Sequence, residues 1–280
     1  MTRAKTVLVP LDGSLPATTA VPVARELGEL YHATVVVFHV TDDALASAAL
    51  VDRMSLSSED VRGLVVERSP GAAAVAIVRE AAEREAALIV MCPRTRTDRG
   101  ARILGTVAEA VLRAAPCPVV LVPPTRGRGH WALRRLLLPH DGTPTSAAVI
   151  GPATQLASTA AAELVVLHVA TPGTERPTEP GTLLSPRYVD QPQHEWPAWA
   201  REFLDRLRAI GRATDGVNMR LALAQGEAGS AIINFARQND SDLIVLGWRG
   251  ALEADRARTM RRVIGASICP VVVFRVQPQG

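Results

Sequence analysis

Residues 7–14 read VLVPLDGS, an apolar run that ends in an acidic residue, a glycine and a hydroxyl. Residues 136–143 repeat this pattern as LLLPHDGT. Repetition on this scale indicates two copies of one structural unit. Further pairs follow in the same order along the chain: VVVFHV (35–40) with LVVLHV (164–169), GAAAVAI (71–77) with GEAGSAI (226–232), LIVM (88–91) with LIVL (243–246), and CPVV (117–120) with CPVV (269–272).

Each copy alternates short runs of Val, Ile and Leu with alanine-rich segments of helical period, such as residues 17–30, 72–84 and 106–115. Continuous apolar strands that alternate with helices are typical of a parallel sheet covered on both faces. The sequence therefore predicts an α/β fold of two tandem doubly wound, Rossmann-like parallel-sheet domains.

The predicted boundaries follow the proline and glycine content of the chain. Proline, glycine and arginine crowd residues 122–130, which places the first domain at 1–125, a linker at 126–132 and the second domain at 133–280. The second copy also carries an insertion at about 171–197, which is too polar and too rich in proline for a packed element. A helical pattern at 198–212 follows the insertion.

The composition argues against several classes of protein. The 280 residues carry a formal net charge of +3, which does not suggest a nucleic-acid binder. Three cysteines are too few, and odd in number, for a disulfide framework. Apolar runs in the chain fall short of about 20 residues, the length of a membrane span. We therefore expect a soluble, cytoplasmic protein that binds neither nucleic acid nor membrane.

An aspartate ends the first predicted strand of each copy, Asp12 in the first and Asp141 in the second. Ligands of open parallel sheets bind beyond the carboxyl ends of the strands, so both carboxylates lie on the expected ligand edge. There they could select a hydrogen-bonding ligand such as a base. The alternative is a structural role, because Asp-Gly is a common turn pair and aspartate often caps a helix.

The loop after the fourth strand of the first copy is rich in arginine and leads into Gly105-Thr106. Thr106 and Glu109 have the spacing of a capping box, which predicts Thr106 as the N-cap of a helix that runs to Ala115. A helix start with free amides beside arginines favours a phosphate-binding site. A plain helix start beside solvated charges is the alternative.

The second copy differs at this place. Gly247 and Gly250 would allow close approach of the backbone, but Ala257 and Arg258 align with Gly105 and Thr106. A methyl group and a long side chain stand where the site needs bare backbone. We expect the second site to be the weaker one.

Histidine and cysteine do not form a metal or redox motif in this sequence. His39 and His168 sit inside strand ends, where packing or hydrogen bonding is the expected role. Cys117 and Cys269 precede the last strands and are expected to be buried small residues. Cys92 enters the expected ligand edge, but a lone cysteine is weak evidence for redox chemistry.

Through these residues the chain resembles a tandem universal stress protein. The ATP-binding branch of that family carries the signature Gly-x2-Gly-x9-Gly-Ser/Thr. Its four positions fall on Cys92, Thr95, Gly105 and Thr106 in the first copy, where the last two conform. In the second copy Gly247 and Gly250 conform, while the remaining pair does not. Each copy therefore keeps a complementary half of the motif.

The resemblance implies a fold like the adenine nucleotide alpha hydrolases and a site for ATP, with or without Mg²⁺, in the first domain more than in the second. The two aspartates would meet the adenine, and the backbone near Val40 and Val169 would line the base and ribose. The site residues that it implies are Pro10, Leu11, Asp12, Val40, Met91, Cys92, Thr95, Gly105, Thr106, Asp141, Val169, Gly247 and Gly250.

The function that the resemblance implies is an adenine-nucleotide-binding regulatory module of the stress response, either non-catalytic or a very slow ATPase. An interaction scaffold with decayed motifs is the alternative from another class. A receiver-type phosphoacceptor would want a lysine after the last strand, and Lys5 is the only lysine in the chain. No G-x-G-x-x-G follows the first strand of either copy, which disfavours a dinucleotide oxidoreductase.

The resemblance also implies how the copies associate. The last strands, residues 118–122 and 270–276, would pair the two copies as an intramolecular pseudo-dimer. Both segments are apolar enough to need burial. A homodimer of two chains is the expected further assembly.

Overall fold

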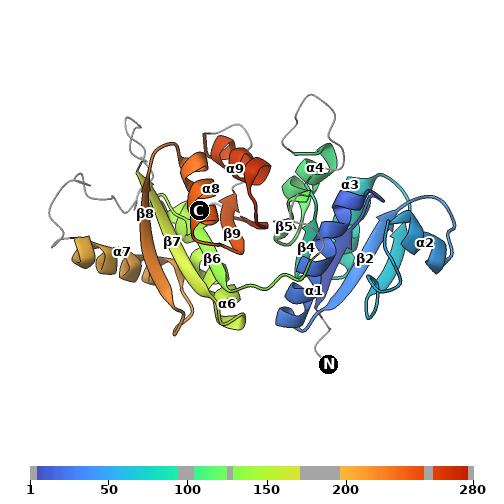
Figure 1. The fold of residues 1–280 in the computed structure, drawn as a ribbon, viewed down its shortest axis with the longest axis horizontal. Helices are drawn as coiled ribbons and strands as arrows, with labels where there is room; N and C mark the ends of the chain where they lie inside the picture. The colour runs from blue at the N-terminus through green and yellow to red at the C-terminus, as the bar shows by residue number, and fades with distance from the viewer. Residues whose placement is uncertain (1–4, 94–103, 125–128, 171–195, 249–254, 277–280) are drawn as a thin grey trace. The chain divides into compact units, whose positions relative to one another are not determined.

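The computed structural model describes residues 5–93, 104–124, 129–170, 196–248 and 255–276. The chain divides into two compact units by its contacts. The first comprises Met1–Ala132 with Ile264–Val273, and the second comprises Leu133–Val263 with Phe274–Gly280. Figure 1 draws the first unit mainly in blue and green and the second mainly in yellow to red.

The first unit is built on a sheet in the order β3-β2-β1-β4-β5, with β10 after β5. The strands β1 to β5 are parallel, and β10 runs antiparallel to β5 through the pairs Val271 with Leu121 and Val273 with Val119. These pairs agree with the implied pairing of the last strands. The strands are β1 (Thr6–Pro10), β2 (Thr34–Val40), β3 (Val65–Ser69), β4 (Leu88–Met91), β5 (Val119–Leu121) and β10 (Val271–Arg275).

Helices cover both faces of this sheet, which explains why all five residues of β1 are buried. The helix α1 packs on β1, β2 and β4, while α3 and α4 pack against one another (Figure 1). Gly28 lets α1 approach β2, because a Cβ there would lie 2.5 Å from Val35 Cγ2. The helices are α1 (Ala20–Tyr31), α2 (Ser47–Arg53), α3 (Ala73–Glu83) and α4 (Thr106–Ala114), with the 3-10 helix η1 (Leu15–Thr19) before α1.

The single helix predicted over residues 17–30 is divided in the structure. The 3-10 helix η1 has Pro16 in its first turn, and α1 starts afresh at Ala20. This start puts Pro22 in the first turn of α1, where its missing N–H removes no helical hydrogen bond. Proline therefore sets the boundary that the apolar periodicity did not reveal.

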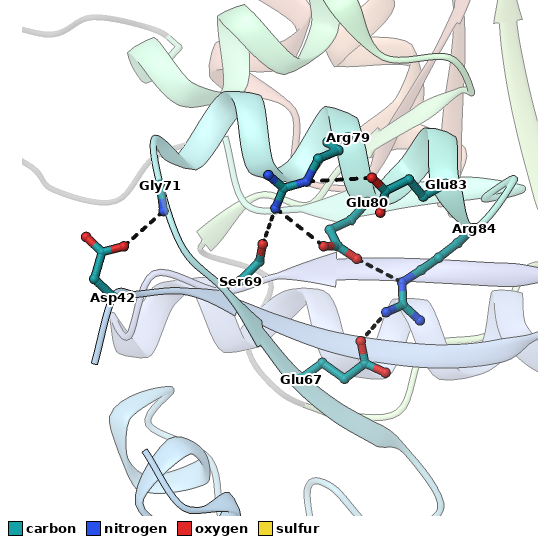
Figure 2. A network of polar contacts seen from close by, with 8 residues as sticks. All are labelled: Asp42, Glu67, Ser69, Gly71, Arg79, Glu80, Glu83 and Arg84. Atoms are coloured by element: carbon teal, nitrogen blue, oxygen red, sulfur yellow. Dashed lines mark hydrogen bonds and ion pairs between the residues drawn. The ribbon is translucent and has the colours of Figure 1, made fainter. Parts of the chain in front are cut away.

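A polar network fastens the edge strand β3 under α3 (Figure 2). Arg84 at the end of α3 forms ion pairs with Glu67 of β3 and, at 3.2 Å, with Glu80 of its own helix. Arg79 donates to Ser69, the last residue of β3. These contacts tie the outermost strand of the first unit to the helix that covers it, although β3 has a neighbour on one side only.

The second unit repeats the arrangement with a wholly parallel sheet in the order β9-β6-β7-β8. Its strands are β6 (Arg135–Pro139), β7 (Glu163–Ala170), β8 (Met219–Gln225) and β9 (Leu243–Trp248). Its helices are α5 (Pro144–Ala147), α6 (Ile150–Thr159), α7 (Trp196–Gly211), α8 (Ala228–Gln238) and α9 (Asp255–Ala266). The helix expected after the insertion is α7, which packs on α5, α6 and β8 (Figure 1).

Candidate functional site

The strand order gives each unit a topological switch point. In the first unit β1 lies between β2 and β4, so the chain leaves β1 towards one edge of the sheet and returns to the other side at β4. The pairing of Leu8 with Ile89 brings the carboxyl ends of β1 and β4 together. Asp12 and Cys92, which follow those ends, therefore lie at the switch point, the place at which open α/β sheets bind ligands.

Asp12 forms a tight turn at this switch point. Its Oδ1 accepts hydrogen bonds from Ser14 N at 3.0 Å and Ser14 Oγ at 2.7 Å. The structural role that was the alternative for Asp12 is therefore present. The side chain is nevertheless exposed, and its Oδ2 has no partner among the described residues. Asp12 can thus stabilise the turn with one oxygen and still offer the other to a ligand.

Residues at the end of α2 and just after it contact this turn and hold it in place. Gly13 has a φ of 89°, and a Cβ there would lie 2.6 Å from the carbonyl oxygen of Arg53. Ser55 Oγ donates to the carbonyl of Gly13 at 2.6 Å. Glycine is therefore required here both for the left-handed backbone and for the close approach of the next segment.

His39 has the packing role that its position predicted. It is buried, and its Nδ1 donates to the carbonyl of Leu11 at 2.7 Å. Leu11 N in turn donates to the carbonyl of Phe38 at 2.8 Å, which extends the pairing of β1 and β2 by one residue. The end of β2, including Val40, is thereby held against the Asp12 turn, with Val40 only partly buried.

The start of α4 differs from the prediction in one respect. Gly105, not Thr106, is the N-cap: it has an extended backbone, and its carbonyl accepts the first helical hydrogen bond from Glu109 N at 3.0 Å. The prediction of Thr106 as N-cap in a capping box was wrong, because Thr106 is already helical. Glu109 pairs along the helix with Arg113, at 2.8 Å.

Gly105 also joins this helix start to the loop after β4. Its N–H donates to the carbonyl of Pro93 at 2.9 Å, and an added Cβ would lie only 3.2 Å from the same oxygen. The first N–H groups of a helix have no intrahelical acceptor, and here they begin at Thr106. Met91 and Cys92, which precede this loop, are buried, whereas Thr95 lies outside the described residues.

The second unit holds its aspartate more tightly. Asp141 is half-buried, and its Oδ1 accepts from Thr143 N at 3.1 Å, Thr143 Oγ1 at 2.7 Å and Ser146 Oγ at 2.6 Å. Val169 lies near the end of β7 and is partly buried. The same edge therefore exists twice, but the second aspartate has more internal donors than the first.

The helix start of the second unit is displaced in sequence. The helix α9 begins at Asp255, so Ala257 and Arg258 are already inside it rather than at its start. Gly247 is the fifth residue of β9, where a Cβ would lie 3.1 Å from Val149 Cγ1. Its small size is thus explained by packing, and Gly250 lies outside the described residues.

One buried residue at this edge was missed by the sequence reasoning. His140 takes the place of Leu11 in the repeated motif and lies beside His168 of β7. The signal was available, because a histidine replaces leucine between two otherwise matching strands. His168 itself is buried and hydrogen-bonded, as its position predicted.

The cysteines offer little reactive thiolate. Burial raises the pKa of Cys117 to about 12, although a hydrogen bond with the backbone of Ile89 opposes part of that rise. Cys92 and Cys269 are both buried. A thiol is nucleophilic only as its thiolate, so these environments do not favour redox or nucleophilic chemistry.

Comparison with known proteins agrees with this architecture. The sequence model of the universal stress protein family matches residues 3–123 and again residues 132–275. The universal stress protein YxiE of Bacillus subtilis is 28% identical over 149 residues, which cover 50% of this chain and 98% of YxiE. A universal stress protein of Mycobacterium tuberculosis is 26% identical over 166 residues, 59% of this chain and 55% of that protein.

Solved structures share the fold over the whole chain. A universal stress protein of Archaeoglobus fulgidus superposes with a TM-score of 0.61 at 18% identity, covering 98% of this chain and 97% of its own. Universal stress proteins solved with cAMP and with dAMP match 51% and 50% of this chain, at TM-scores of 0.36 and 0.34. Because the family model matches both units almost in full, the chain belongs to the universal stress protein family.

Proposed function

We propose that the first unit binds an adenine nucleotide, ATP with or without Mg²⁺, and that the protein acts as a regulatory module of the stress response. The observation that carries this proposal is the start of α4. Gly105 ends the loop after β4 and Thr106 begins the helix, at the edge of the sheet where Asp12 follows β1. Free amides and a carboxylate thus flank one switch point.

Asp12 and the start of α4 suit different parts of the nucleotide. The carboxylate of Asp12 can accept a hydrogen bond from the amino group of a base, and the exposed side chain is available for it. The first-turn amides of α4 and the positive end of its dipole suit phosphate oxygens. Gly105 keeps that approach free of a side chain, which the aligned Ala257 does not.

Mg²⁺ bound with a nucleotide takes most of its ligands from phosphate oxygens and water, so it does not require a cluster of protein ligands. In the described part of the chain, no group of three or more His, Cys, Asp or Glu side chains could hold a metal ion. Likewise, none of the described helices is long and apolar enough to cross a membrane.

We infer a binding role rather than a catalytic one. Catalysis needs a nucleophile or base held near the reacting phosphate by a third group. At the described edge of the first unit, Asp12 is tied to its own turn, His39 is tied to Leu11, and Cys92 is buried. A bound nucleotide would thus be hydrolysed slowly, if at all.

Isothermal titration with ATP tests the proposal, and the repeat supplies a matched control. Asp12→Ala should weaken binding by about tenfold, the effect of losing about 1.4 kcal/mol of hydrogen bonding. Asp141→Ala, the same change in the second unit, should leave the affinity within about twofold. Equal losses in both variants, or no loss in Asp12→Ala, would remove the proposed site.

Gly105→Ala tests the phosphate side. This substitution introduces alanine, the residue that the second copy has at the aligned position 257. The added Cβ would lie 3.2 Å from the carbonyl oxygen of Pro93. We expect about tenfold weaker ATP binding with a smaller loss for adenosine, because adenosine has no phosphate to seat on the helix. A parallel loss for both ligands would point to a folding defect, which a thermal melt of the variant identifies.

The alternative is an interaction scaffold that binds no nucleotide. Acid extraction of freshly purified protein, followed by chromatography of the released nucleotides, separates the two. Absence of bound nucleotide together with no heat of ATP binding would favour the scaffold. The homodimer expected from the family resemblance stays a prediction, which light scattering of the eluting protein can check.

A further inference from the structure

The second unit contains a buried cluster at the place where the first unit has leucine. His140 follows β6 as Leu11 follows β1, and both side chains are buried. His168 of β7 donates from Nδ1 to the carbonyl of His140 at 3.0 Å. Phe203 of α7 lies at a steep angle to both rings, 88° for His140 and 64° for His168, with ring centroids 5.9 Å and 6.0 Å away. One side chain of α7 thus packs against both histidines.

A hydrogen bond fixes the protonation state of His140. The N–H of Gly142 donates to His140 Nδ1 at 2.8 Å, so this nitrogen is an acceptor and the neutral ring carries its hydrogen on Nε2. Ser146 Oγ lies 3.3 Å from Nε2 and 3.4 Å from Nδ1, and it donates to Asp141 Oδ1 at 2.6 Å. The ring is therefore part of the turn that holds Asp141.

Protonation is incompatible with this arrangement. An imidazolium carries N–H on both nitrogens and cannot accept a hydrogen bond, so the Gly142 bond must break when His140 gains a proton. The new charge would also be buried, because only 3% of His140 is exposed, and burial of a charge is costly.

In the described part of the chain, the groups named above that contact the two rings come from the turn, β7, α5 and α7. Asp141 of the turn and His168 of β7 are titratable, while α5 contributes Ser146 and α7 contributes Phe203. Burial lowers the pKa of His168, and the carbonyl of His140 and the charge of Asp141 offset this only in part. The neighbourhood therefore favours a neutral His168 ring at neutral pH.

We propose that protonation of His140 releases the turn at residues 140–143 and the helix α7 from the sheet of the second unit. The first unit has Leu11 at this place and keeps its turn over the same pH range. The second unit thereby contains a pH-sensitive element. Its opened form is favoured as the pH falls below about 6.5, the pKa of an exposed histidine, because the ring takes up its proton only when the turn opens. This element does not depend on nucleotide binding.

Hydrogen-exchange mass spectrometry of the full chain at pH 7.5 and 5.5, corrected for the intrinsic exchange rates, tests the proposal. One proton-linked opening changes by at most about tenfold per pH unit. We expect the protection of α7, measured over residues 200–211, to fall by up to about tenfold between the two pH values, since an exposed histidine has a pKa of about 6.5. The protection of α1 in the first unit, measured over residues 20–31, should change by less than about threefold.

Three variants assign the effect. His140→Leu installs the residue of the first unit, and His140→Gln keeps a neutral polar side chain that can accept from Gly142 but cannot become a cation. Both should abolish the pH dependence of α7, and the glutamine variant guards against a folding defect in the leucine variant. Wild-type α7 that is indifferent to pH, or a His140→Gln variant that still loses protection, overturns the proposal. Loss of the effect in His168→Gln alone would assign it to His168 instead.

Discussion

At the scale of single residues, two glycines of the first unit with positive φ, Gly13 and Gly63, show that such a position can be constrained in two ways. Gly13 needs a left-handed backbone, with φ at 89°, and it also lies under the carbonyl of Arg53. Gly63 has a similar φ of 73°, but a Cβ there would meet nothing within 4 Å. A substitution at Gly63 therefore costs only the strained backbone conformation, whereas a substitution at Gly13 adds a steric clash with the carbonyl of Arg53.

We predict that Gly63→Ala destabilises the protein by about 1 kcal/mol, the usual cost of a left-handed alanine. Gly13→Ala should cost about 2–4 kcal/mol, because the methyl group must also push back the end of α2. Urea unfolding of the two variants, followed by circular dichroism, measures the difference. Equal midpoints would show that the Arg53 segment moves away without cost.

At the scale of elements, three parallel strands of the second unit are joined by one carboxylate. Glu163 at the start of β7 accepts from Arg135 of β6 at 2.8 Å and from Arg220 of β8. Burial alone would raise the pKa of Glu163, but the hydrogen bonds and charges of Arg135 and Arg220 outweigh it and lower the pKa. The folded state therefore favours the ionised carboxylate.

The sign of the pH effect follows from that lowered pKa. The stabilisation by Glu163 is complete above the ordinary glutamate pKa of about 4.3 and is lost as the pH falls through the lower folded value. We expect Glu163→Gln to lower the midpoint of urea unfolding at pH 7. Near pH 3, the midpoints of the variant and the wild type should lie closer together. Glu202→Gln, in an exposed ion pair of α7, should change the midpoint little at either pH. A constant gap for Glu163→Gln at both pH values would contradict this account.

At the scale of the whole molecule, the two units share a fold but differ at the edge that would bind a ligand. In the first unit α4 begins at Thr106, directly after Gly105. In the second unit the aligned residues, Ala257 and Arg258, lie inside α9. At the corresponding edge of the second unit, His140 is buried and its ring contacts Phe203. One duplicated framework thus carries two different local chemistries.

We predict that ATP protects the first unit alone. A ligand stabilises only the state that binds it, by about 2.7 kcal/mol at a concentration of 100 times Kd. Hydrogen exchange with saturating ATP should slow in β1, β4 and α4 and stay unchanged in β6, β9 and α9. Slowing of both units to the same extent would show two equivalent sites, and slowing of the second alone would reverse the assignment.

The sequence by itself determined the duplication, the parallel α/β fold and the edge on which Asp12 and Asp141 lie, because strand period and repeated motifs are local properties of the chain. It also indicated that His39 and His168 pack rather than bind. It did not determine the N-cap of α4, which depends on the Gly105 contact with Pro93. Nor did it show the hydrogen bond from Gly142 to His140, which depends on the conformation of the turn. The ring contact between His140 and Phe203 was also not predictable, since residues so far apart in sequence meet only when the helices and strands pack. Local patterns therefore predicted the framework, and tertiary packing decided which side chains are buried, bonded or left open on it.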